Sequence, residues 1–204
     1  MKKIFTTLFV VLGIYSMAHA QTKGQNEFGF NLGINSTYVS SSAQLGTATG
    51  LLWGFTAAVS AEHYLSNDWG IKAKVIYDSK GWSDGYIQDN TKTVTGVSYS
   101  LNYITIPITA NWHFGREKNW YANAGPYVGF LLNATDNYTN SDLKSRFNST
   151  DGGLDLGLGI KFPVTKNIKA FFEYDGQLGF ANVLANSSAG AVMEKASFSV
   201  GLKF

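Results

Sequence analysis

The chain has 204 residues and no cysteine, which excludes a disulfide scaffold and any site that depends on a thiolate. Charged residues make up 15% of the sequence, well below the ~25% typical of soluble domains. Once Lys2 and Lys3 are set aside, the 16 basic residues become 14 and equal the 14 acidic ones, so no basic surface for nucleic acid is expected.

The first 20 residues have the pattern of a secretory signal peptide. Lys2 and Lys3 precede a mostly apolar run from Ile4 to Tyr15, and a small-x-small cleavage site ends at Ala20. The alternative is a membrane anchor, but the run is shorter than the ~20 residues that a helical span needs. We therefore expect residues 1–20 to be removed and residues 21–204 to form one domain.

After residue 21, apolar residues alternate with polar or small ones, which is typical of strands with one apolar face. Eight such segments are predicted, at residues 28–35, 53–62, 69–78, 97–114, 120–132, 154–162, 168–175 and 195–204. The fourth segment changes phase, because Val97, Tyr99 and Leu101 have one parity and the apolar residues from Ile104 onward have the other. A β-bulge near Tyr103 would keep them on one face, so a bulge is predicted there.

The connections between these segments alternate in length. Short turns are predicted at residues 66–68, 115–119 and 163–167, and long polar loops at 38–50, 81–96, 133–153 and 179–194. Short turns at one rim and long loops at the other are typical of an antiparallel up-and-down barrel in the outer membrane, where they face the periplasm and the exterior respectively.

Aromatic residues of the apolar parity gather near the two ends of the predicted strands. The end with the short turns has Phe28, Trp69, Trp112, Phe114, Trp120, Phe162 and Phe204, and the other end has Trp53, Tyr77, Tyr99, Phe130 and Tyr174. Two such girdles are typical of a wall in contact with lipid. The alternative is a soluble lipocalin-like barrel with these aromatics in its core, but the polar parity is rich in glycine, which suits a narrow lumen. We therefore predict an all-β, eight-stranded transmembrane β-barrel located in the cell outer membrane.

Four short motifs carry a family resemblance. They are the segments YITIPI at 103–108, AGPYVG at 124–129, DLGLG at 155–159 and GLKF at 201–204. With them, residues 25–204 resemble the small outer-membrane β-barrel proteins of the PorT-like "porin family" type, with OmpX-like barrels as more distant analogues. The resemblance implies that the final aromatic residue, Phe204, helps the barrel-insertion machinery to recognise the chain.

Charged residues also occur on the inward parity. They are Glu62, Lys72, Lys74, Asp78, Asp155, Lys161, Lys169, Glu173, Asp175 and Lys203. Because isolated buried charges are costly, we expect them to pair with one another or to reach water at the ends. A three-residue turn at 66–68 would place Glu62 opposite Lys72, which predicts an ion pair between them. An eight-stranded interior is about wide enough for side chains to fill, which favours a plug over a solute conduit.

No pattern points to catalysis, a metal or another cofactor. Both mature histidines, His63 and His113, are expected beside short turns as interfacial residues, and no long loop contains a histidine. Asp136, Asp142 and Asp151 lack the spacing of a calcium loop. We expect a monomer without enzyme activity that has a structural role or recognises an extracellular partner through its four long loops. A narrow channel for small solutes and an accessory role in secretion or assembly are the alternatives.

Overall fold

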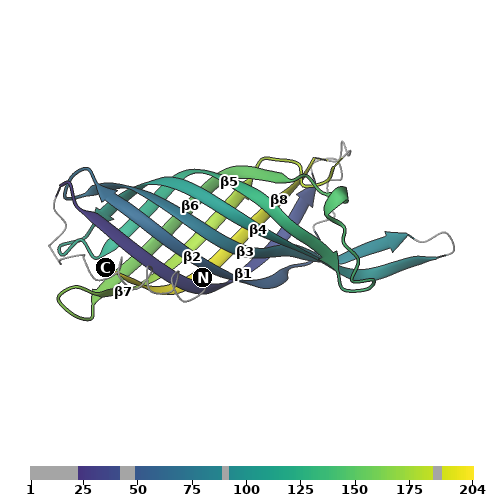
Figure 1. Ribbon diagram of the computed structural model, residues 1–204, viewed down its shortest axis with the longest axis horizontal. Helices are drawn as coiled ribbons and strands as arrows, with labels where there is room; N and C mark the ends of the chain where they lie inside the picture. The colour runs from purple at the N-terminus through teal and green to yellow at the C-terminus, as the bar shows by residue number, and fades with distance from the viewer. Residues whose placement is uncertain (1–22, 42–48, 89–91, 186–189) are drawn as a thin grey trace, which may run out of the picture.

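The computed structural model describes residues 23–41, 49–88, 92–185 and 190–204. They form one closed antiparallel barrel in which each strand pairs with its neighbours in chain order, as predicted (Figure 1). The eight strands are β1 (Asn26–Ser41), β2 (Leu52–Tyr64), β3 (Trp69–Gln88), β4 (Thr93–Phe114), β5 (Trp120–Asp136), β6 (Thr150–Pro163), β7 (Lys169–Gly179) and β8 (Ala191–Lys203). One 3₁₀ turn, η1 (Lys144–Arg146), lies between β5 and β6. The predicted signal peptide lies outside the described residues.

Three tight turns close one end of the barrel, at the left of Figure 1. In the β2–β3 turn the Ser66 hydroxyl accepts hydrogen bonds from the backbone nitrogens of Asp68 and Trp69, at 3.2 and 3.0 Å. Thr165 does the same in the β6–β7 turn for Asn167 and Ile168. These hydroxyls replace backbone partners that the reversing chain cannot supply, which is why short polar turns suffice there. Among the described residues, no helix is long and apolar enough to cross a bilayer.

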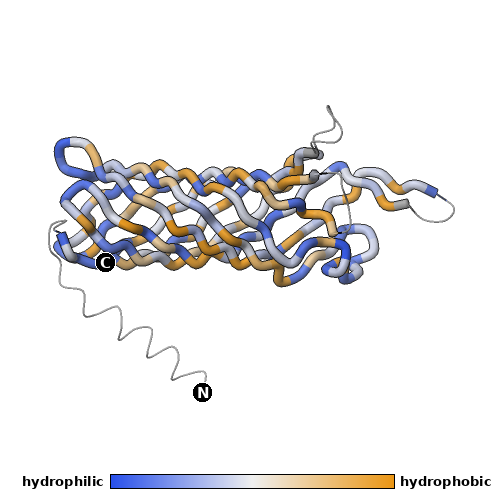
Figure 2. Tube along the Cα trace, turned by 90° about the horizontal axis from the view of Figure 1, so that it is seen from above, coloured by the Kyte–Doolittle hydropathy of each residue, from blue (hydrophilic) through white to orange (hydrophobic). Residues whose placement is uncertain are grey.

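Apolar and polar positions alternate along the strands (Figure 2). The apolar side chains are exposed and form the outer wall. At the end with the tight turns, Trp69, Trp112, Phe114 and Trp120 follow one another in stacked contacts around the wall. At the other end Trp53 is 68% exposed, and Phe130 and Tyr174 also face outward. Tyr99 was predicted to belong to this second girdle, but that prediction was wrong. Its side chain points into the barrel and is only 9% exposed.

The predicted bulge occurs at the expected height but on the neighbouring strand. The β4–β5 register shifts between Asn102, which pairs with Asn133, and Tyr103, which pairs with Leu131. The extra residue is therefore Leu132 of β5, whereas β4 keeps a single parity from Val97 to His113. Val97, Tyr99 and Leu101 consequently face the interior, so the expectation that they face outward was wrong.

Residues 81–96, predicted as a loop, mostly continue the sheet. β3 and β4 contain 20 and 22 residues and stay paired as far as Gln88 and Thr93. The hairpin leaves the barrel at a kink, where Gly81, Asp84 and Gly96 all have positive φ values. A Cβ atom on Gly81 would lie 1.9 Å from the Tyr99 carbonyl oxygen, so only glycine fits there. Figure 1 shows this hairpin extending past the other connections. We call its outer part, residues 83–88 and 93–98, the arm.

The barrel closes where the first strand meets the last, and we call this contact the seam. β1 pairs with β8 from Gly29 opposite Lys203 to Ser41 opposite Ala191. Beyond this ladder, the Phe204 nitrogen donates to the Phe28 carbonyl at 2.8 Å, and the Phe28 nitrogen donates to the Phe204 carbonyl at 3.1 Å. The chain end is therefore part of the sheet.

Deletion of Phe204 is expected to lower the amount of folded barrel recovered from cells, because it removes two seam hydrogen bonds and the terminal aromatic group. The folded fraction can be followed over time by its faster migration on unheated gels. Phe204→Trp, which keeps the backbone contacts and an aromatic end, should restore assembly. Unchanged insertion kinetics after the deletion would contradict a role for this residue.

Candidate functional site

The lumen contains charged side chains at three heights, which we call the inner, middle and outer layers. The inner layer, next to the tight turns, has Glu27 and Glu62 as its carboxylates. Lys203 lies 2.9 Å from Glu27 and 3.3 Å from Glu62, and Lys169 lies 2.8 Å from Glu27. Lys161 lies 3.5 Å from Glu27 and donates a 3.0 Å hydrogen bond to the Tyr64 hydroxyl. Three lysines therefore converge on two carboxylates.

The middle layer joins β3 to β7 across the lumen. Glu173 accepts hydrogen bonds from Lys72 and, at 2.6 Å, from Lys74. Lys74 also donates to Asp175 at 2.8 Å. All four side chains are buried, so each charge depends on the others for the interactions that water would otherwise provide.

The outer layer contains two further ion pairs. Lys195 lies 2.7 Å from Asp78, and Lys80 lies 3.4 Å from Asp151. Lys80 also donates to the Gln177 side chain at 2.9 Å, and the Tyr127 hydroxyl donates to Asp151 at 3.1 Å. Aromatic rings of the lumen lie beside the lysine nitrogens, as where Lys80 lies 5.2 Å from the Tyr127 ring centre.

The ten lumen residues proposed from sequence all lie on inward positions of the barrel. Nine of them are buried, and Lys169 is partly exposed at the rim with the tight turns. The register places Glu62 opposite Lys72 as predicted. The two side chains do not form the expected ion pair, so that prediction was wrong. Glu62 contacts Lys203 and His113 instead, and Lys72 contacts Glu173 on the far wall.

Among charged residues and histidines, sequence reasoning missed five members of the lumen network. They are Glu27, Lys80, His113, Asp151 and Lys195. Glu27 and Lys80 continue the inward parity of their segments, since the first segment was begun one residue too late and the third was ended two residues too early. His113 was expected at the membrane interface, but it is fully buried and its Nε2 lies 2.6 Å from Glu62. His63 does lie at the exposed rim, where its Nδ1 is 2.8 Å from the Asn26 side chain.

The aspartates of the third long loop have structural partners. Asp136 accepts hydrogen bonds from the backbone nitrogens of Tyr138 and Thr139, and Asp142 accepts one from that of Lys144. Asp151 belongs to the outer layer. In the part of the chain that the structure describes, no group of three or more His, Asp or Glu side chains is arranged to hold a metal ion.

An apolar cluster, which we call the cap, fills the lumen at the end with the long loops. Its members are Val39, Trp82, Val97, Tyr99, Leu101, Tyr103, Leu131, Ala134, Leu143, Phe147, Val183, Ala191 and Met193. The Phe147 ring meets the Trp82 ring edge-on, with ring centres 5.7 Å apart. The Asn148 nitrogen donates to the Val183 carbonyl at 2.9 Å, so the third and fourth loops are tied together over the mouth.

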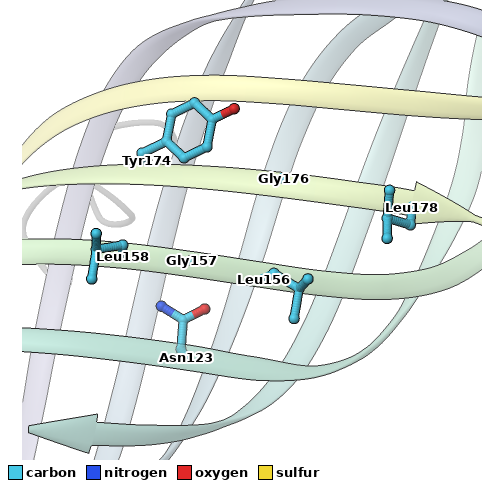
Figure 3. A pocket seen from close by; sticks show the side chains of 7 residues that line it. All are labelled: Asn123, Leu156, Gly157, Leu158, Tyr174, Gly176 and Leu178. Atoms are coloured by element: carbon cyan, nitrogen blue, oxygen red, sulfur yellow. The ribbon is translucent and has the colours of Figure 1, made fainter.

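A shallow apolar depression lies on the outer wall over β6 and β7 (Figure 3). Leu156, Leu158, Tyr174 and Leu178 surround it, and Gly176 occupies an outward position without a side chain. A Cβ on Gly176 would have no neighbouring atom closer than 3.9 Å. The depression is open to the surroundings of the wall, and the buried Asn123 side chain of β5 also lines it.

Comparison with known proteins gives the following matches. The sequence model of the family described as "Outer membrane protein beta-barrel domain" matches residues 19–185. Neisserial surface protein A (NspA) has 18% identity and a TM-score of 0.50, covering 86% of this chain and 95% of that chain. OprG from Pseudomonas aeruginosa has 12% identity and a TM-score of 0.47, and the match covers 91% of this chain and 99% of that chain. Ail from Yersinia pestis has 12% identity and a TM-score of 0.45, and the match covers 90% of this chain and 100% of that chain. No curated protein matches the sequence.

Proposed function

Because the chain belongs to the outer membrane protein β-barrel domain family and its barrel lies in the outer membrane, we propose that it is a closed, non-catalytic scaffold that presents the arm for recognition outside the cell. In this proposal the barrel acts as a monomer of the PorT-like type. The motifs behind that resemblance lie in the wall, with one each on β4, β5 and β6 and the last at the end of β8.

The contents of the lumen support a closed barrel. Ion pairs join opposite walls in the middle layer, and the cap fills the outer mouth above them. A hydrated ion would have to separate paired charges and then pass an apolar cluster, and both steps are unfavourable. A solute channel is therefore the less favoured alternative.

The arm carries the recognition part of the proposal. Beyond the bridge between Gly50 and Ser83, no described strand lies beside the free edge of β3. Beyond the pair of Tyr99 with Asp136 and the adjoining contacts of Ser98 with Asn137, none lies beside the free edge of β4. Open edges present backbone donors and acceptors to which an extended peptide adds as a further strand. The partner of this surface is therefore an extended polypeptide segment.

A peptide-display library selected against the barrel in lipid nanodiscs tests this proposal. Selected peptides should bind at least tenfold more weakly once alternate backbone nitrogens are methylated, because strand addition uses those donors. The comparison barrel replaces residues 83–98 with Asn-Gly, which joins the directly paired Trp82 and Tyr99 through a two-residue turn and removes Val97 of the cap together with the arm. Peptides that bind this barrel equally well, or that tolerate methylation, would contradict recognition by the arm.

The wild-type barrel is expected to show no steady conductance in a planar lipid bilayer, because the cap and the middle layer close the lumen in series. Single-channel recording provides the measurement, in salt of about 1 M so that long-range charge effects are screened. Stable ohmic steps whose ion selectivity changes in Lys72→Ala or Lys74→Ala would instead favour the channel.

A further inference from the structure

One carboxylate faces outward on the barrel wall, at the end with the long loops. Glu194 of β8 pairs with Tyr38 of β1 across the seam, and its chain neighbours Met193 and Lys195 are both buried in the lumen. Because successive residues of a strand alternate between its two faces, Glu194 lies on the outer face. The other outward residues of β8, at 192, 196, 198, 200 and 202, are all apolar. A carboxylate in this row needs polar partners.

Two hydroxyl groups hold this carboxylate in position. The Tyr38 hydroxyl donates to the Glu194 Oε2, and the Ser40 hydroxyl donates to the Oε1 at 3.1 Å. Both donors are neutral, so they leave the negative charge without a counter-charge. Lys195 pairs with Asp78 inside the lumen, and none of the ion pairs of the described residues includes Glu194. The carboxylate is therefore oriented by the protein but remains available to a cationic group from outside it.

The apolar depression of Figure 3 begins beside this carboxylate. Leu178, which lines the depression, is paired directly with Glu194 across the β7–β8 ladder. Gly176, also in the lining, is paired with Ala196, the next outward residue of β8. Directly paired residues have Cβ atoms about 5 Å apart, so Glu194 lies at one end of the depression. Between Tyr174 and Leu178 the depression has no side chain on its floor, because Gly176 occupies that outward position.

The carboxylate and the depression lie at different depths of the membrane. Trp53 of β2 and Phe180, just after β7, are largely exposed aromatic residues at the outer end of the wall, on the two sides of β1 and β8. Aromatic residues of a barrel wall mark the boundary between hydrocarbon and head groups. Glu194 lies near this boundary, and Gly176 lies farther from the long loops. The carboxylate therefore faces lipid head groups, whereas the depression faces acyl chains.

We propose that the outer wall of β7, β8 and β1 binds one membrane lipid whose head group ends in a primary ammonium, as in phosphatidylethanolamine. An ionised carboxylate has about four acceptor positions, so Glu194 can accept from the ammonium while it keeps the Tyr38 and Ser40 hydroxyls. One acyl chain of the same lipid lies in the depression over Gly176. A lipid with an anionic head group and no ammonium meets an uncompensated negative charge at this place.

Native mass spectrometry of the refolded, lipid-free barrel tests the head-group part of this proposal. The barrel is titrated in uncharged detergent with dioleoyl phosphatidylethanolamine or with dioleoyl phosphatidylglycerol, which has the same chains but no ammonium. The wild type should bind the first lipid about tenfold more tightly, the effect of one hydrogen bond between charged groups. Glu194→Gln keeps the size of the side chain and removes its charge, so it should bind the two lipids with equal affinity.

Gly176→Leu tests the acyl-chain part. A Cβ atom at this position would have no neighbouring atom closer than 3.9 Å, so leucine can fill the depression without disturbing the wall. It should weaken the binding of both lipids about tenfold, the loss expected when about two methylene groups are no longer buried. Ala61→Leu, at an exposed outward position of β2, is the matched control and should change neither affinity. Migration on unheated gels verifies that each variant is folded.

Equal wild-type affinity for the two lipids would overturn the proposal, and so would an undiminished preference for phosphatidylethanolamine in Glu194→Gln. Equal effects of leucine at positions 176 and 61 would exclude the depression as the site of the acyl chain. The head-group comparison needs no change at Gly176, so it decides the role of Glu194 even if Gly176→Leu does not fold.

Discussion

Replacing Glu173 with alanine is expected to destabilise the barrel by about 3–5 kcal/mol, the cost of removing one partner from a buried ion pair. Glu173 binds both Lys72 and Lys74, and all three side chains are shielded from water. Its loss leaves Lys72 without an ion-pair partner and Lys74 with only Asp175. Equilibrium unfolding in urea, followed by tryptophan fluorescence, measures the change. Glu117→Ala, in the exposed β4–β5 turn, is the control and should change stability by less than about 0.5 kcal/mol.

A double-mutant cycle makes this expectation specific to the contact. Lys72→Ala combined with Glu173→Ala should cost clearly less than the sum of the single changes, since the second truncation removes a charge that the first left unpaired. The cycle of Glu62→Ala with Lys72→Ala should be closer to additive, because these residues are opposed in the ladder but form no ion pair. Additive changes in the first cycle would exclude the cross-lumen pair.

Replacing Ala73 with arginine is expected to destabilise the barrel by about 2–4 kcal/mol, the cost of a cationic side chain at mid-depth on the lipid face. Ala73 is exposed on the outer wall, between Ala61 of β2 and Ile108 of β4. The loss of unfolding free energy should be measured in lipid vesicles rather than in micelles, because only the vesicles have the hydrocarbon thickness of a bilayer.

Ala73→Leu is the control for this prediction. Leucine also enlarges the side chain but suits hydrocarbon, so it should be neutral or slightly stabilising. Lys74→Ala changes the next residue, which faces the lumen, and should cost mainly the ion pairs with Glu173 and Asp175. Equal costs for arginine and leucine at position 73 would show that this face of β3 does not contact hydrocarbon.

The wall of the barrel is predictable from sequence because lipid imposes one requirement on every outward residue. Alternation therefore located all eight strands and, at Ser66 to Asp68, the turn that sets the Glu62–Lys72 register. The same rule fails outside the bilayer. Val97, Tyr99 and Leu101 are apolar because they form the cap, and alternation does not distinguish an apolar interior from an apolar exterior. The arm was likewise taken for a loop, because no lipid selects apolar residues along it.

The ion pairs of the lumen were not predictable from the ladder alone. Neighbouring strands determine which residues are opposed, but a lysine side chain is long enough to cross a narrow barrel. Lys72 and Glu173 are 101 residues apart and come from β3 and β7, which are not adjacent. Their contact depends on closure, strand tilt and the glycines that leave room for crossing, and these appear only once the full ring exists.

The seam also determines when the barrel can close during synthesis. β1 is the first strand to be synthesised and β8 the last, yet each supplies an edge that the other must cover. Folding slows as contacting residues become more distant in sequence, and uncovered strand edges invite association with other chains. The edge of β1 that faces away from β2 must therefore remain unpaired until nearly the whole polypeptide has been synthesised. A chain that stops before residue 191 has two open edges and no closed form to adopt.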